Sequence, residues 1–395
     1  MHRTALQGPA RGGARTICTT RGVVPHLAHR PSYSSTVSPP PPGPRARTAQ
    51  ALLRPARATL GDGLGNHDNA LNFVRLVLAV VVIIVHAAPL GGFPDLPWHF
   101  LSGTAVNGFF AISGFLIAGS RVRTSLTAFV WRRLLRIFPA YWTTLVLTAF
   151  VVAPVAGAVG HERWDGGSAV SYVVDNAALR IHQWHIDDLL RSVPYPEVWN
   201  GSLWSLEFEG LAYIAAGLLL GLAAVRCRPL LWLTALLLAV LCVQVLAFGP
   251  LDIGSSHYLL GLRLAGFFLA GMVLWAARHH VRVTWWLALP AMVIVCAGRW
   301  MAEPWGWTLT ALPLAYAVLW LGSVLPLRIG ARNDLSYGVY IYAFPLQQLL
   351  VVSGATSVLG YWGYCAVSVA VTLPVAWLSW TLIERPALSL KGLVR

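Results

Sequence analysis

Charged residues are scarce in this chain, since Asp, Glu, Lys and Arg together make up 11% of its 395 residues. A soluble domain carries about 25% charged residues. Hydrophobic residues reach 56%, and the 18 Trp residues suit the aromatic belts at membrane surfaces. The composition argues against an ordinary soluble domain and predicts an all-α, multi-pass protein of the plasma membrane.

Two further classes of site are missing from the sequence. The five cysteines are scattered without a Cys-x-x-Cys pair, so no disulfide framework and no zinc or other metal site is implied. No basic helix with interleaved aromatic residues is present, which argues against a nucleic-acid partner. We therefore attribute the net charge of +14 to membrane topology, with the lipid bilayer as partner.

Residues 1–66 differ from the rest of the chain, because they combine Arg with Pro, Gly, Ser and Thr and lack an apolar period. Such a segment cannot bury enough apolar surface to fold, so we expect a disordered basic tail. The lack of an apolar h-region argues against a secretory signal peptide. Translation from near residues 66–69 is an open alternative. Residues 67–386 form the expected membrane domain, and residues 387–395 a short cytoplasmic tail.

About ten apolar segments beyond Asn69 are long enough to cross a bilayer. They lie near residues 70–88, 104–120, 137–156, 203–224, 229–248, 257–276, 283–300, 306–326, 335–353 and 361–383. With both termini in the cytoplasm, about fourteen loop Arg and Lys residues lie inside and about four outside. This bias predicts that both termini are cytoplasmic. The long loop 157–202 is then external and acidic, either a lid or acceptor-binding element or a solvated connector.

The first apolar segment carries two polar residues, Arg75 and His86. A charge at membrane depth costs about 2.5–3.5 kcal/mol and usually marks a function. Eleven residues amount to about three helical turns, so both side chains project from one face, about 16 Å apart along the axis. The alternative is an Arg that snorkels to the headgroups and a His that bonds a backbone carbonyl.

Two other clusters combine charge with apolar sequence. Arg133 and Arg136 lie one turn apart before the third segment, so their guanidinium groups can converge on one polyanion, unless they are topology anchors. Glu207 and Glu209 lie at the start of the fourth segment, where carboxylates are costly unless paired. Two residues apart, they point about 200° from each other, so at most one faces a given site.

The small residues of Gly108–Ile117 favour close helix packing.

Together these motifs resemble membrane acyltransferase family 3, whose members O-acylate sugars and other acceptors, over nearly all of residues 69–386. The resemblance rests on Arg75 with His86 after ten intervening residues, the Phe-Phe-x-Ile-Ser-Gly-Phe-Leu-Ile run at 109–117, Arg133 and Arg136, the Trp-Ser-Leu-x-x-Glu run at 204–209, and Glu384-Arg385-Pro386.

The chain departs from this family in its ninth segment. Ala343 stands where members often have a second His, so any role of an imidazole there is absent or moved. Gln347 and Gln348 follow in the same apolar segment and need polar partners. They either line the acceptor site or, as we favour, form hydrogen bonds between helices.

The resemblance implies transfer of an acyl group, expected to be acetyl, from cytoplasmic acyl-CoA to a hydroxyl of a glycan, glycolipid or glycoside. His86 is the expected general base or acyl relay, and Glu209 the carboxylate that orients the imidazole. Arg75, Arg133 and Arg136 are expected to bind the donor's CoA moiety. Acyl-CoA is a substrate, and no bound cofactor is expected.

Two other functions fit part of the pattern. A proton-coupled secondary transporter would use His86, Glu209 and Arg263 as a relay, although no repeat symmetry between the halves is visible. A scaffold for a polysaccharide-export complex would leave Arg75 and His86 unexplained.

Overall fold

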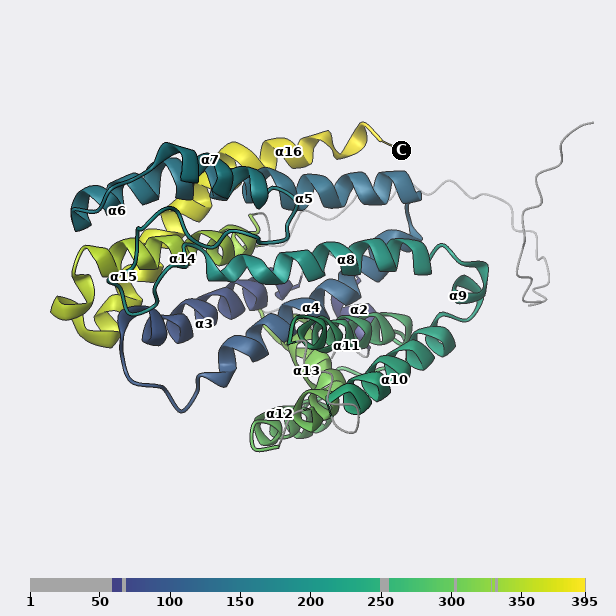
Figure 1. Cartoon of the computed structure of the whole chain (residues 1–395). Helices are drawn as coiled ribbons and strands as arrows, with labels where there is room; N and C mark the ends of the chain where they lie inside the picture. Colours follow the sequence, from purple (N-terminus) through teal and green to yellow (C-terminus); the bar gives the residue numbers. More distant parts are fainter. Residues whose placement is uncertain are drawn as a thin grey trace, which may run out of the picture. The chain divides into compact units, whose positions relative to one another are not determined.

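The computed structural model describes residues 59–65, 69–248, 256–301, 304–327, 329–330 and 333–394. Within these ranges the chain forms helices joined by turns and loops (Figure 1). Thr59 and Arg282 form an isolated β-bridge, and no strand is present in this described part. The all-α prediction is therefore confirmed for the described residues.

The helices follow one another along the chain with these bounds: α2 Leu60–Leu64, α3 Leu71–Gly91, α4 Phe100–Val122, α5 Leu126–Leu147, the π-helical turn η1 Thr148–Val152, α6 Ala153–Gly160, α7 Gly166–Asp175, the 3₁₀ turn η2 Gly201–Leu203, α8 Trp204–Leu219, α9 Ala223–Cys227, α10 Pro229–Phe248, α11 Ser256–Ala276, α12 Trp285–Gly298, α13 Trp305–Val324, α14 Ser336–Val352, α15 Ala355–Ser379, the π-helical turn η3 Trp380–Glu384, α16 Arg385–Ser389 and the 3₁₀ turn η4 Leu390–Gly392.

Each of the apolar segments predicted from the sequence contains a helix, but the helices differ in length. In the described part, 7 helical runs are long and apolar enough to cross a membrane: Leu71–Gly91, Phe100–Val122, Leu126–Gly160, Pro229–Phe248, His257–Ala276, Trp305–Val324 and Ala355–Gly392. The other three, α8, α12 and α14, have 16, 14 and 17 residues. The count of ten spans therefore stays a prediction, as does the orientation of the termini.

The helical run through α5, η1 and α6 is longer than a bilayer requires. Its 35 residues extend about 52 Å at 1.5 Å per residue, whereas the hydrocarbon core is about 30 Å thick. The run therefore continues beyond the predicted segment 137–156. Arg133 and Arg136 lie on this same helix and not in a loop before it.

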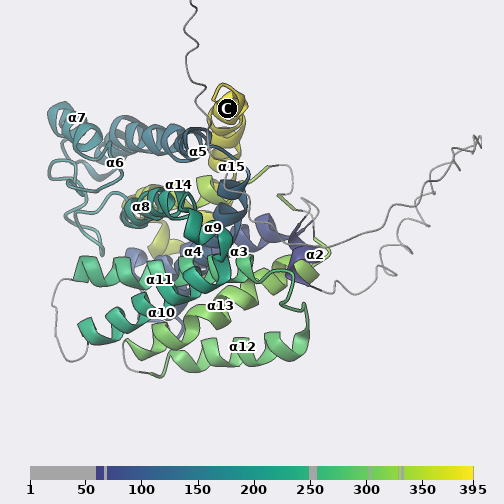
Figure 2. The same ribbon diagram turned by 90° about the vertical axis from the view of Figure 1, so that its right-hand side faces the viewer.

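The centre of the bundle consists of α3, α4, α11, α13 and α14. Helix α4 packs on α3, α11 and α13, and α3 also packs on α14 and α15. In Figure 2, α5 to α7 lie on one side of α8 and α14, with α10 to α13 on the opposite side. Gly114 of α4 and Gly271 of α11 permit direct backbone contact: a Cβ atom on either would overlap a backbone carbonyl of the other helix. The packing role expected for Gly108–Ile117 is therefore confirmed at Gly114.

We expect Gly114→Ala to destabilise the protein, because its Cβ would overlap the Phe268 carbonyl oxygen and push α4 from α11. Overpacking costs about 1–3 kcal/mol. The measurement is the thermal transition of the detergent-solubilised protein. Gly103→Ala on the same helix is the control, since its Cβ would meet only the Arg263 side chain at 3.8 Å. Equal transitions for the two variants would contradict the packing argument.

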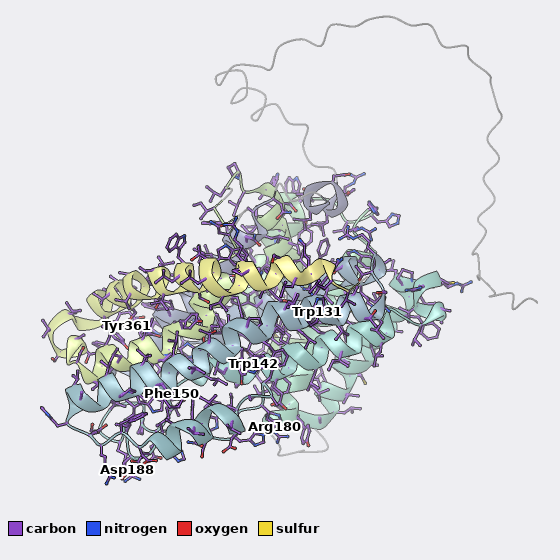
Figure 3. All side chains as sticks on the ribbon, turned by 90° about the horizontal axis from the view of Figure 1, so that it is seen from above. Trp131, Trp142, Phe150, Arg180, Asp188 and Tyr361 are labelled. Carbon is purple, nitrogen blue, oxygen red and sulfur yellow. The ribbon has the colours of Figure 1, made fainter. Side chains whose placement is uncertain are left out.

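The loop 157–202 was predicted to be external and either a lid or acceptor-binding element or a solvated connector, and several of its residues pack against the helices. Ile186, Leu189, Leu190 and Trp199 are fully buried. The Tyr141 hydroxyl donates to the Asn176 carbonyl at 2.6 Å, and the Trp142 indole to the Ala177 carbonyl at 2.9 Å. Figure 3 shows the loop residues Arg180 and Asp188 beside the helix that carries Trp142 and Phe150.

Part of the N-terminal region that was predicted to be disordered is helical. Most of the tail expected at residues 1–66 lies outside the described residues, but Leu60–Leu64 form the short helix α2. Thr59 and Asp62 form its capping box, and Leu60 is fully buried. The backbone N–H groups of Leu60 and Gly61 donate to the carbonyls of Val281 and Arg278 at 2.9 and 2.8 Å. The expected disorder is therefore wrong for residues 59–65.

Candidate active site

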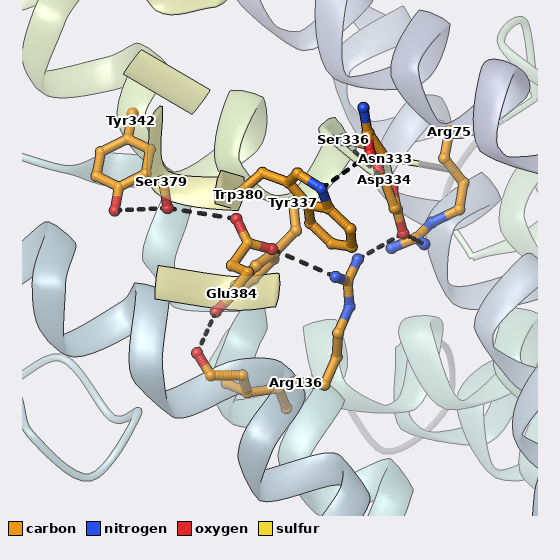
Figure 4. Close-up of polar contacts among 11 residues, drawn as sticks. Arg75, Arg136, Asn333, Asp334, Ser336, Tyr337, Tyr342, Ser379, Trp380 and Glu384 are labelled. Carbon is orange, nitrogen blue, oxygen red and sulfur yellow. Dashed lines mark hydrogen bonds and ion pairs between the residues drawn. The ribbon is translucent and has the colours of Figure 1, made fainter. Parts of the chain in front are cut away.

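Two arginines and two carboxylates meet where α3, α5, α14 and η3 approach one another (Figure 4). Arg75 of α3 donates to Asp334, which directly precedes α14. Arg136 of α5 donates to the same Asp334 oxygen at 2.5 Å and to Glu384 at 3.3 Å. Glu384 is 2% exposed, so its charge depends on Arg136 for a partner. The cluster joins four chain segments.

A shell of polar groups completes this arginine–carboxylate cluster. The Ser336 hydroxyl and backbone N–H donate to Asp334 at 2.6 and 3.3 Å. The Ser379 hydroxyl donates to Glu384 at 3.3 Å, and the Tyr342 hydroxyl donates to Ser379 at 3.1 Å. Burial opposes ionisation of Asp334, but the two guanidinium groups and Ser336 outweigh it, and its pKa falls to about 2. Asp334 is therefore a permanent anion near neutral pH.

Sequence reasoning did not find Asp334. It lies 259 residues from Arg75 along the chain, and no local pattern joins the two. One signal was present: a lone acidic residue at the start of the ninth apolar segment, on the side where arginines dominate the loops. The sequence identified Glu384 only as part of the Glu384-Arg385-Pro386 motif, without a predicted partner.

His86 faces α14 on the same side of α3 as Arg75. Its ring packs edge-on against Phe344 of α14, with centroids 5.9 Å apart. Its Nδ1 lies 2.8 Å from the backbone carbonyl of Val82. A carbonyl can only accept, so Nδ1 carries a proton, and in the neutral ring Nε2 then keeps its lone pair. This is the tautomer that a general base at Nε2 requires.

Glu209 does not orient this imidazole, contrary to expectation. Its carboxylate accepts from the Tyr213 hydroxyl on the same helix, and no hydrogen bond joins it to His86. Glu209 instead lines a narrow cavity with Arg75, Ser113 and Tyr340. The cavity measures about 30 Å³, room for one or two water molecules. Val82 thus occupies the position expected for Glu209 beside the ring.

Glu207 points away from this cavity, as the helix geometry predicts. It lies 3.5 Å from His257 of α11 and lines a groove of about 350 Å³ between α5 and α8. The two glutamates therefore have separate environments, as expected for side chains that point about 200° from each other on one helix.

Arg133 and Arg136 do not converge on one site. Arg136 is held by the two carboxylates, whereas Arg133 stacks over Phe129 and Tyr213, 5.9 and 5.8 Å from their ring centroids. Arg133 also lines the groove between α5 and α8. Its Nε is buried with no hydrogen-bond partner among the described residues. The expected pair of converging guanidinium groups is corrected to one structural arginine and one groove-lining arginine.

A row of aromatic side chains on α14 joins the arginine–carboxylate cluster to His86. Tyr337 lies under Arg136 at 5.5 Å, Tyr340 bonds the Ser205 hydroxyl at 2.8 Å, and Phe344 contacts His86. These positions share one face of the helix and span about 10 Å. Sequence reasoning missed Tyr340 and Phe344, although a spacing of three and four residues was visible.

Gln347 forms the hydrogen bond between helices that we favoured, whereas Gln348 bonds a loop. The Gln347 amide donates to the Ile83 carbonyl at 3.0 Å, one turn before His86. The Gln348 amide donates to the carbonyls of Tyr195 and Val198 at 2.9 Å each. The first bond fixes α3 and the second fixes the buried loop, so α14 positions both. Ala343 is buried in the same helix.

The three residues of the transporter alternative lie apart. Arg263 of α11 stacks on Trp307 of α13, 4.9 Å from the ring centroid, and lines a third cavity. Glu209 lines the narrow cavity of Arg75 and not this third cavity. The relay of the transporter alternative stays a prediction.

Comparison with known proteins identifies the family. The acyltransferase domain of family 3 matches residues 68–381. The chain is similar to the O-acetyl transferase of Shigella phage Sf6, with 28% identity over 329 residues, covering 80% of this chain and 95% of that protein. It is also similar to nodulation protein 10 of Rhizobium leguminosarum bv. viciae, with 27% identity over 367 residues, covering 82% and 94%. No solved structure matches. The chain thus belongs to acyltransferase family 3 and is an acyltransferase.

Proposed function

We propose that this protein transfers an acyl group, acetyl above all, from acyl-CoA to a hydroxyl of a glycan, glycolipid or glycoside at the plasma membrane. The observation that carries the proposal is the contact of His86 Nδ1 with the Val82 carbonyl at 2.8 Å, which in the neutral ring leaves the lone pair on Nε2. Similarity to an O-acetyl transferase supports acetyl transfer to oxygen.

In the proposed reaction, the acceptor hydroxyl attacks the thioester carbonyl carbon. His86 Nε2 accepts the hydroxyl proton as the C–O bond forms. The C–S bond then breaks, and the imidazolium returns the proton to the CoA sulfur. In an alternative, His86 Nε2 attacks the thioester carbonyl carbon, the C–S bond breaks, and CoA leaves as the thiolate. The acceptor hydroxyl then attacks the acyl carbon on Nε2, the C–N bond breaks, and the hydroxyl proton passes to the thiolate.

Donor binding is proposed at the end of the bundle that carries the arginines, with both termini and acyl-CoA in the cytoplasm. Arg133 is the preferred contact for the donor phosphates, because it lines the groove between α5 and α8 and is not held by the two carboxylates that bind Arg136. Arg75 and Arg136 share Asp334, so we assign them to holding the helices in place. The aromatic row on α14 provides the proposed route from donor to His86.

The direct test uses the full chain in vesicles with radiolabelled acetyl-CoA and membrane glycan. We expect label in the glycan only when the chain is present, with no dependence on an imposed proton gradient. Gradient-dependent movement of a solute without labelled product would support the transporter alternative and refute the proposal.

We expect Arg133→Ala to raise the KM for acyl-CoA about 10-fold or more, from the loss of charge-assisted bonds of about 1.5–3 kcal/mol each. The matched variant Arg136→Ala should reduce the yield of folded protein, because it leaves the buried Glu384 without its guanidinium partner. Steady-state kinetics and gel filtration measure the two effects. If the KM for acyl-CoA is unchanged in Arg133→Ala, Arg133 does not bind the donor and serves only to fix the membrane topology.

We expect Glu209→Gln to lower kcat about 10-fold or more, because the substitution removes the negative charge that Glu209 places in the narrow cavity it lines with Arg75. Glu207→Gln is the control, since Glu207 faces the groove and the partly exposed His257. Both variants are assayed for labelled glycan at matched protein amounts. Equal losses would refute a special role for Glu209.

A further inference from the structure

Gln347 of α14 carries a buried polar atom without a partner close to His86. The residue is 1% exposed, and its Oε1 has no hydrogen-bond partner among the described residues. An amide oxygen can only accept a hydrogen bond, and leaving it unpaired in a buried site is costly. This oxygen therefore calls for a donor that the described part of the chain does not supply.

The other end of the same amide fixes where this oxygen lies. Gln347 Nε2 donates to the Ile83 carbonyl at 3.0 Å, within one turn of α3 before His86. Exchanging the two amide atoms would place two oxygens against each other, so the bond to Ile83 assigns the nitrogen and the oxygen. Gln347 thus holds an oriented acceptor at the turn of α3 that carries His86.

His86 offers a second acceptor at this turn. Its Nδ1 contacts the Val82 carbonyl, and in the neutral ring Nε2 keeps a lone pair. The residue is partly exposed, so it is accessible to a ligand. Two acceptors at one turn of a helix match a ligand that carries hydroxyl groups on adjacent carbon atoms. This inference rests on the proposed function, in which His86 receives the proton of the acceptor hydroxyl.

Aromatic residues border the two acceptors. Phe344 packs edge-on against His86 and against Tyr195, with ring centroids 5.9 Å apart in both pairs. Tyr195 is 40% exposed, and the Gln348 amide donates to its backbone carbonyl at 2.9 Å. Small-molecule sites combine such apolar and aromatic surfaces with a few oriented polar groups. The exposed Tyr195 ring therefore offers a surface for the apolar face of a sugar ring.

We propose that Gln347 and His86 form an acceptor site for a sugar ring with two neighbouring hydroxyl groups. The hydroxyl that is acylated donates to His86 Nε2, and the hydroxyl on the adjacent carbon donates to Gln347 Oε1. An alcohol with a single hydroxyl group would leave Gln347 Oε1 unpaired. A site that is built to bond a hydroxyl group rejects a ligand that lacks it, so this site selects sugars over simple alcohols.

The test measures binding alone, on the full chain in nanodiscs without acyl-CoA, by saturation-transfer NMR titration. The probes are the methyl glycosides of glucose, galactose and mannose, and tetrahydropyran-2-methanol, a similar ring with one hydroxyl group. We expect at least one glycoside to bind about 10-fold more tightly than tetrahydropyran-2-methanol. Equal affinities for the two kinds of probe, or no binding of any glycoside, would overturn the proposal.

Gln347→Met keeps the approximate size of the side chain and removes the acceptor. It should weaken glycoside binding about 5-fold or more and leave the affinity for tetrahydropyran-2-methanol unchanged. Because this variant also loses the bond to Ile83, Tyr361→Phe is the matched control: the Tyr361 hydroxyl donates to the neighbouring Ile84 carbonyl at 2.7 Å. Gln244→Met controls for the substitution itself, since Gln244 is a buried glutamine of α10.

Both control variants should bind the glycosides as the wild-type protein does. Equal losses in Gln347→Met and Tyr361→Phe would show that Gln347 only positions α3, and would overturn the proposal. Because no donor is present, binding is measured independently of the transfer reaction. Transfer without this binding pattern would refute the acceptor site, whereas this binding pattern without transfer would support the site and refute the proposed function.

Discussion

His86→Ala is expected to lower acetyl transfer about 100- to 10,000-fold, the range attributed to a positioned general base, with little change in the amount of folded protein. The structural cost is small because the Nδ1 bond to Val82 is local to α3, and the Val82 carbonyl keeps its helical acceptor role. The measurement is labelled glycan per mole of inserted protein.

His185→Ala is the control for this variant, because His185 is an exposed loop residue and should leave transfer unchanged. Withholding the acceptor separates the two proposed routes. In the two-step route the wild-type protein retains label after denaturation and His86→Ala does not. Near-normal transfer by His86→Ala would remove His86 from both routes.

Asp334→Asn is expected to destabilise the protein by about 3–5 kcal/mol, because one carboxylate serves both Arg75 and Arg136 in a mostly buried site. Asp188→Asn is the matched control. Its partner Arg191 and Asp188 itself are 60% and 64% exposed, so the loss should stay within about 1 kcal/mol. Thermal transitions and monodispersity after solubilisation measure the difference. Similar transitions for the two variants would show that the cluster is not what holds these helices together.

The low pKa of Asp334 also predicts how its contribution to protein stability depends on pH. Its pKa of about 2 lies below the ordinary value of 3.8, so its stabilising contribution is complete above about pH 4 and is lost as the pH falls toward 2. Asp334 itself therefore contributes no pH dependence to stability between pH 5 and 8. Any change of transfer rate in that range reports other groups.

Much of the local structure could be predicted because the patterns that specify it are local. The apolar segments predicted the helices, and the spacing of Arg75 and His86 predicted a shared face, which both residues turn toward α14. The same geometry separated Glu207 from Glu209. The motifs predicted the family, which the family match over residues 68–381 confirmed.

The partners of these residues could not be predicted, because they come from distant parts of the chain. Glu209 was expected beside His86, but Val82 holds the ring. Arg133 and Arg136 were expected to converge, yet the rotation of α5 sends them to different neighbours. The acidic loop 157–202 could not be assigned as a lid or as a solvated connector from its sequence, and the structure buries Ile186, Leu189, Leu190 and Trp199 of this loop.

The sequence by itself determined the membrane class, the positions of the helices and the faces on which charged residues lie, because helical periodicity and hydropathy act within about twenty residues. Only the tertiary structure determined which charged residues form ion pairs with one another. Asp334 joins Arg75 across 259 residues and Arg136 across 198, and this pairing depends on how α3, α5 and α14 pack together. A buried charge is costly unless it is paired. The packing of the helices determines which residue becomes its partner, and a local sequence pattern does not contain that information.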